Sequence, residues 1–142
     1  MPSRRRSRQR ALQLLFLWDA RRQPLDDVFS AYYDALYADE HPARDTFAAD
    51  LVQGAIEHIA ELDDRIARHA EHWRMERMAA VDRNLLRAAV AEFLAYPETP
   101  RAVVINEALE IARKFSTPES VHFVNGVLDS IGKELETKSS CQ

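Results

Sequence analysis

Residues 81–93, with the sequence VDRNLLRAAVAEF, decide the fold class of this chain. Their apolar side chains recur every three or four positions, which is the spacing of residues on one face of an α-helix. The members of this series are Val81, Leu85, Leu86, Ala89 and Phe93. Tyr96-Pro97 follows, and the residue before a proline disfavours helical backbone. The stretch therefore predicts a helix that ends before Pro97 and buries one face.

The same spacing continues on both sides of this helix. It predicts further helices over residues 3–20, 25–36, 47–73, 104–115 and 118–135. No segment alternates apolar and polar residues as a half-buried strand would. We therefore expect an all-α fold of about six or seven helices. A connector at residues 74–78 divides one domain into subdomains of about residues 1–73 and 74–135, and residues 136–142 are expected to form a flexible tail.

Local features mark helix ends and helix contacts. Asp45 is expected to cap the helix that starts near Phe47, because a short acidic side chain accepts hydrogen bonds from free backbone N–H groups. Thr117-Pro118-Glu119 is a stronger start signal, with a capping residue, a proline at the first helical position and a carboxylate in the first turn. Gly54 and Gly126 interrupt helical patterns, and we expect them to allow close approach of neighbouring helices.

The composition is typical of a soluble globular domain. The 142 residues are 46% apolar and 30% charged. No apolar run approaches the roughly 20 residues that span a bilayer. The apolar run at residues 12–18 is short and is followed by charged residues, so it does not resemble a secretory signal. The single cysteine, Cys141, excludes an intramolecular disulfide and a cysteine-based zinc site.

The charge is distributed unevenly. The net charge is −4, but the first 22 residues contain seven arginines and one aspartate, which gives them +6 and leaves −10 for the remainder. We call residues 4–10 the arginine head; its arginines are Arg4, Arg5, Arg6, Arg8 and Arg10. Guanidinium groups make bidentate contacts with phosphate, and we expect these turns to project into solvent and contact a polyanion. A solubilising, disordered tail is the alternative.

The chain offers little catalytic or metal-binding chemistry. It has no glycine-rich phosphate loop and no nucleophile elbow. Glu119 and His122 match one half of a di-iron helix motif, which needs a second copy and two further glutamates. His69 and His72 are spaced to share a helix face, but their charged neighbours indicate a solvated surface. We therefore expect no enzymatic activity, no cofactor and no metal site.

Several segments in order resemble the NusB family of transcription antitermination factors, across residues 4–131. The most specific is FVNGVLD at residues 123–129. The other matching segments lie at residues 4–16, 73, 81–92 and 104–115.

The resemblance implies an all-α fold of two packed three-helix bundles, without catalytic activity or a cofactor. It also implies binding to the boxA element of nascent ribosomal RNA transcripts, as a single strand, together with the ribosomal protein NusE. This assembly joins other Nus factors and RNA polymerase in a complex that reads past terminators. Such a protein works in the cytoplasm, and both monomers and homodimers occur in the family.

Site residues follow from the same resemblance. The residues that match RNA-contacting positions are Arg4, Arg5, Arg6, Arg8, Phe16, Glu119 and Phe123. Phe16 stands where family members often have tyrosine, so it keeps a stacking surface and lacks a hydroxyl. Glu119 is expected to accept a hydrogen bond from a base, which selects bases rather than phosphates. Glu76 and Asp82 match positions that face NusE, where acidic groups would meet a basic partner. Core packing is the alternative for Phe16 and Phe123.

Two other functions stay open beside this one. Modules that resemble NusB are also fused to ribosomal RNA methyltransferases, but we expect no room for a cofactor-binding α/β domain in 142 residues. The second is a helical scaffold that binds only protein through its acidic remainder. Asn106 and Glu107, within the matched segment 104–115, are interpreted as structural.

Overall fold

The computed structural model describes residues 3–36, 45–71 and 74–140, and within them every regular element is a helix. The α-helices are α1 (Arg4–Arg21), α2 (Leu25–Leu36), α3 (Thr46–Glu57), α4 (Ile59–His69), α5 (Ala80–Ala95), α6 (Arg101–Phe115) and α7 (Pro118–Ser140). A short 3₁₀ helix, η1 (Met75–Arg77), precedes α5. The expected all-α fold is confirmed. Trp73, His72 and Cys141 lie outside the described ranges.

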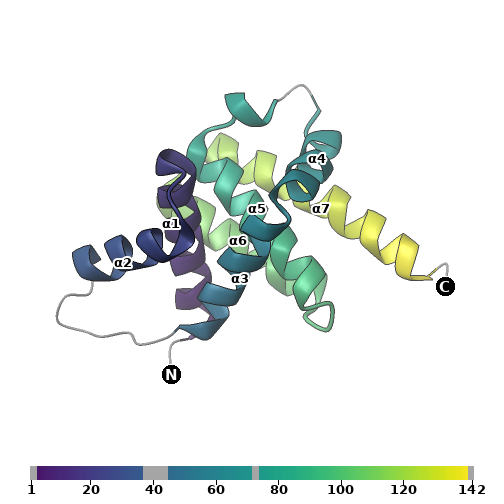
Figure 1. Ribbon diagram of the computed structural model, residues 1–142. Helices are drawn as coiled ribbons and strands as arrows, with labels where there is room; N and C mark the ends of the chain where they lie inside the picture. Colours follow the sequence, from purple (N-terminus) through teal and green to yellow (C-terminus); the bar gives the residue numbers. More distant parts are fainter. Residues whose placement is uncertain (1–2, 37–44, 72–73, 141–142) are drawn as a thin grey trace.

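Helix α5 lies at the centre of the molecule (Figure 1) and packs against α1, α3, α4, α6 and α7. Residues 84–92 along it are all buried, as expected for a helix enclosed by others. Helices α2 and α3 pack against α1, whereas α6 and α7 pack against each other and against α5. Helix α4 precedes the expected boundary near residue 74, yet it packs mainly against α5 and α7. The second group of helices therefore begins before that boundary.

The single long helix expected over residues 47–73 is wrong, because α3 ends at Glu57 and α4 begins at Ile59. His58, between them, has φ −114° and ψ 26°, outside regular helix geometry. The apolar spacing continues across the break because both helices bury one face. Those faces have different partners: α3 packs against α1 and α5, and α4 packs against α5 and α7. No proline marks the change of direction, so spacing alone did not reveal it.

Both predicted helix starts are confirmed. Asp45 Oδ1 accepts a hydrogen bond from the backbone N–H of Ala48 at 3.1 Å, and Thr117 Oγ1 accepts one from Ser120 at 3.1 Å. Helix α7 begins at Pro118, as the start signal predicts. It continues to Ser140, so most of the segment expected as a tail is helical in the described residues.

The expectation for the glycines is wrong. A Cβ atom added at Gly54 or at Gly126 would meet nothing within 4 Å, so neither position is needed for close helix approach. Gly132 is the tightly packed glycine, since an added Cβ would overlap the side chain of Arg101. The flexible end of that arginine, rather than another helix backbone, occupies the space.

Replacing Gly126 with alanine should therefore stabilise the protein. The position lies inside α7, and alanine in a helix interior is favoured over glycine by about 0.5–1 kcal/mol. Urea unfolding followed by circular dichroism would measure the gain. The matched change G132A should give no such gain, because it displaces Arg101. Loss of stability in G126A would show that Gly126 has a packing role after all.

Candidate nucleic-acid interface

Only part of the arginine head faces solvent. Ser7 Oγ donates to Asp45 Oδ1 at 2.8 Å, and Arg10 Nη1 donates to Asp45 Oδ2 at 2.9 Å. All three residues are buried. The expectation that these turns project into solvent is therefore wrong for Ser7 and Arg10. Asp45, at the start of α3, supplies the buried partner that makes their burial possible.

Arg8 also forms an ion pair with a carboxylate. Its Nε and Nη2 atoms donate to the two oxygens of Glu92 on α5, at 2.8 and 2.6 Å. The side chains of Arg8 and Glu92 are only 11% and 2% exposed. The hydrogen bond to Glu92 raises the pKa of Arg8 against the opposing effect of burial. Because separating a buried, bidentate pair leaves a charge without compensation, this contact mainly holds α1 on α5.

The three remaining head residues of the predicted site, Arg4, Arg5 and Arg6, are exposed. Arg4 Cζ lies 3.9 Å from the ring centroid of Phe47, a cation–π contact. Arg5 Nε donates to Glu107 Oε2 on α6 at 2.9 Å. No side chain in the described part of the chain pairs with the Arg6 guanidinium. The structure thus presents three accessible guanidinium groups at the start of α1.

Helices α1 and α6 run in the same direction beside this head. Arg8, near the start of α1, pairs with Glu92 near the end of α5. Ser116, just after α6, donates to Asp82 near the start of α5. Both α1 and α6 are therefore antiparallel to α5. The Arg5–Glu107 pair ties α1 to α6 near the exposed arginines.

Exposed aromatic side chains lie toward the far ends of these two helices. Phe16 on α1 is 42% exposed, so it is available for stacking rather than buried in the core. Phe115, the last residue of α6, is 39% exposed and has Lys114 Nζ 5.4 Å from its ring centroid. Phe115 is the last residue of the helix predicted over residues 104–115. Its position at the end of the helix is the sequence feature that indicates an exposed side chain.

A groove at the start of α5 contains three of the predicted site residues. It is lined by Arg77, Met78, Ala79, Asp82, Glu119, Ser120 and Phe123. Glu119 is exposed, whereas Phe123 is half-buried and packs against the core. Glu119 and Phe123 are four residues apart on α7, which places them on one face of the helix. Glu119 and Phe123, which both match RNA-contacting positions, therefore line the same groove.

The two acidic residues expected to face NusE occupy different environments. Glu76, in η1, is exposed. Asp82 is only 6% exposed, and its oxygens accept hydrogen bonds from Ser116 at 2.9 Å and Ser120 at 2.7 Å. These bonds join α5 to the start of α7. Asp82 therefore supports the groove from inside, and Glu76 remains the accessible carboxylate of the pair.

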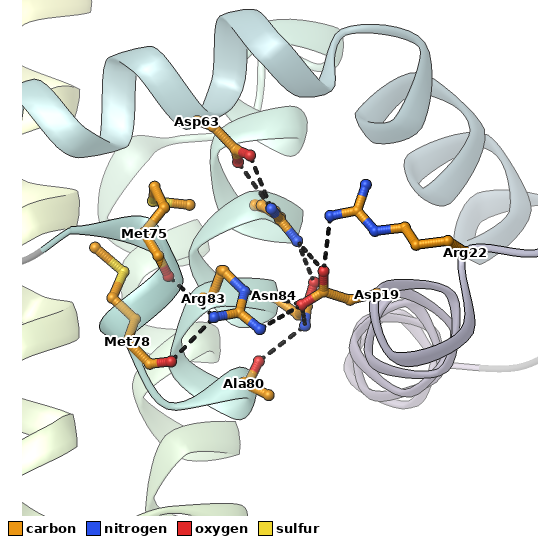
Figure 2. Close-up of polar contacts among 9 residues, drawn as sticks. Asp19, Arg22, Asp63, Met75, Met78, Ala80, Arg83 and Asn84 are labelled. Carbon is orange, nitrogen blue, oxygen red and sulfur yellow. Dashed lines mark hydrogen bonds and ion pairs between the residues drawn. The ribbon is translucent and has the colours of Figure 1, made fainter.

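Asp19 forms the centre of a second ionic contact between α1 and α5 (Figure 2). Its Oδ2 atom accepts hydrogen bonds from Arg83 at 2.8 Å and Asn84 at 3.1 Å. Its Oδ1 atom lies 3.2 Å from Arg87 Nη1 and accepts a bond from Arg22 at 3.1 Å. Burial alone would raise the pKa of Asp19, but the hydrogen bonds from Arg83 and Asn84 and the charge of Arg87 lower it to about 2.

The same arginines extend this contact to two further elements. Arg87 makes a bidentate pair with Asp63 on α4, with both distances at 2.8 Å. Arg83 donates to the backbone oxygens of Met75 and Met78, which fixes η1 and the lining of the groove. Sequence reasoning did not identify this network. The sequence feature that could have indicated the network is Asp19, a single carboxylate directly after the apolar run at residues 12–18.

The described structure also bears on metal binding and on membrane spanning. Among the described residues, no group of three or more histidine, cysteine, aspartate or glutamate side chains is arranged to hold a metal ion. His69 instead contacts Ser130 and Glu134 on α7, both at 2.7 Å. No described helix is long and apolar enough to cross a membrane.

The described residues thus form an all-helical fold in which other helices enclose α5 and three arginines are exposed at one end of α1. A family model described as the NusB family matches residues 5–133. The transcription antitermination protein NusB of Solibacter usitatus is 66% identical over 95% of this chain and 92% of its own length.

Solved structures agree with these sequence matches. NusB of T. maritima is 36% identical with a TM-score of 0.80, covering 94% of this chain and 92% of its own. A crystal structure of the antitermination factors NusB and NusE in complex with double-stranded RNA contains a chain that is 28% identical, also with a TM-score of 0.80. That match covers 92% of this chain and 96% of the other. The chain belongs to the NusB family of transcription antitermination proteins.

The Asp19 contact should make stability depend on pH in a defined window. The pKa of Asp19 is lowered on folding from 3.8 to about 2, so its contribution is fully present above pH 4 and is lost as the pH falls through 2. The shift corresponds to about 2 kcal/mol. Urea unfolding of the wild type and of D19N at a series of pH values would measure it. The difference between them should shrink below pH 4, and a constant difference would contradict this assignment.

Proposed function

We propose that this protein is a non-enzymatic RNA-binding adaptor of transcription antitermination. It binds the boxA element of ribosomal RNA transcripts as a single strand, together with the ribosomal protein NusE. It then joins other Nus factors and RNA polymerase in the cytoplasm. The observation that carries the proposal is the cluster of three accessible arginines at the start of α1, in a family whose solved members include NusB bound with NusE to double-stranded RNA.

The arginine head supplies the phosphate contacts. Arg4, Arg5 and Arg6 are exposed and close together on consecutive positions. With three phosphate contacts, the slope of log affinity against log salt for a single strand is about −2. Arg8 matches a contact position too, but its pairing with Glu92 makes it the residue that anchors this turn to α5. Its proposed part in binding is therefore to position the other three.

Base recognition is assigned to the other end of α1. Phe16 offers an exposed ring for stacking, which is how single-stranded RNA is commonly held. The groove at the start of α5 and α7 supplies Glu119 and Phe123. Phe123 presents its half-buried ring, and the Glu119 carboxylate accepts hydrogen bonds from base amino or imino groups. These groups discriminate between bases, whereas the arginine head does not.

The NusE contact is assigned to η1, directly before the start of α5. Glu76 is exposed there and would pair with a basic ribosomal protein. Asp82 contributes indirectly, because its bonds to Ser116 and Ser120 hold the start of α7 against α5.

Specific RNA binding is tested with two strands. Filter binding in the presence of the NusE-like protein should give a higher affinity for boxA-like RNA than for a scrambled strand of equal length. Loss of that difference in F16A would locate base reading on α1. Equal affinity of the wild type for both strands would overturn the specific function and leave an electrostatic binder.

The exposed arginines are tested by a triple change. R4A/R5A/R6A should weaken binding to both strands and reduce the salt slope by about 2, that is, by about 0.7 for each lost phosphate contact. R68A, which removes an exposed arginine from α4, is the matched control and should change neither. If complex assembly on RNA is unchanged in the triple variant, the protein is a scaffold that binds only protein.

A further inference from the structure

We propose that Glu107 acts as an electrostatic brake on the arginine head and so sets its affinity for RNA of any sequence. The inference rests on the proposed RNA-binding function and adds a residue to it. Glu107 lies on α6, a helix that carries none of the residues matched to RNA or NusE contacts. Its side chain nevertheless reaches the exposed arginines.

Glu107 contacts two head arginines with its two oxygens. Oε2 accepts a hydrogen bond from Arg5 Nε at 2.9 Å, and Oε1 lies 4.0 Å from Arg8 Nη1. The hydrogen bond to Glu107, and then its charge, raise the pKa of Arg5. In this cluster, Arg5 and Arg8 are opposed by Glu107 and Glu92. The net charge of the four groups is zero, so half of the nominal charge of the four predicted contact arginines is cancelled locally.

The two carboxylates of this cluster differ in how easily they release an arginine. Glu92 is 2% exposed and holds Arg8 with two short bonds, so that pair stays closed. Arg5 is 61% exposed, and it is bound to Glu107 through one nitrogen only. Exposed pairs of this kind contribute little to stability and exchange readily with solvent or another anion. A phosphate is therefore able to replace or share this contact.

The carboxylate opposes RNA in two ways. It competes with phosphate for Arg5, and it places a negative charge beside the backbone of any bound strand. Both effects are independent of base sequence. A weaker arginine head makes recognition depend more on the contacts at Phe16 and in the groove, because non-specific binding comes mostly from phosphate contacts.

The test replaces Glu107 with glutamine. E107Q keeps an oxygen that accepts from Arg5 and removes the charge. Its affinity for short oligouridylate, a probe without base-specific information, should rise about two- to fivefold. The salt slope should steepen by up to about 0.7, because Arg5 then makes its phosphate contact without competition from a carboxylate. E110Q removes the same charge from α6, but Glu110 pairs with Arg113, and this matched control should show a smaller change.

A double variant separates the brake from general repulsion. E107Q should give a smaller gain in an R5A background, because only the repulsion between the carboxylate and the strand remains there to be relieved. If the wild type binds RNA and a folded E107Q binds it equally or more weakly, the brake is overturned and the proposed function remains intact. An equal gain in the R5A background overturns the assignment to Arg5. Absence of RNA binding by both wild type and E107Q overturns the proposed function itself.

Discussion

Helix α1 lies against α5 with charged groups enclosed at both ends of their contact. At one end Arg8 pairs with Glu92, and at the other Asp19 accepts bonds from Arg83 and Asn84. Hydrophobic burial has no direction, so apolar side chains alone would allow the helices to slide or rotate. Enclosed charges require their partners at hydrogen-bonding distance. They therefore fix the register of α1 on the helix that contacts nearly every other element (Figure 1).

This register decides which arginines are available to a ligand. Arg8 and Arg10 form ion pairs with buried carboxylates, and Arg5 forms an ion pair with Glu107 at the surface. Arg4 is placed over the Phe47 ring, and Arg6 remains accessible. The strong positive charge of the head is thus largely balanced by acidic residues from α3, α5 and α6. Charge arithmetic along the chain located this arginine-rich segment but overstated its free charge.

The fold was predictable where the interactions that define a helix join residues close together in the sequence. Asp45 and Thr117 cap helices by bonding to residues three positions later, and both were identified. The helix break at His58 was not predicted, because the apolar spacing continues through it while the packing partners change. Gly54 and Gly126 were misassigned because a helical glycine gives no indication of what lies opposite. Asp82 was expected to face a partner, but it is buried and accepts hydrogen bonds from Ser116 and Ser120, which lie 34 and 38 positions away.

The sequence by itself determined the helical class, the helix starts and the family, together with the segment that carries the arginines. These follow from spacings of three or four residues and from ordered strings of matched residues. The tertiary structure alone decided the role of each side chain. Arg8 and Glu92 are 84 positions apart, and Arg5 and Glu107 are 102 apart. Whether an arginine holds two helices together or faces a phosphate depends on such distant partners, which no local pattern specifies.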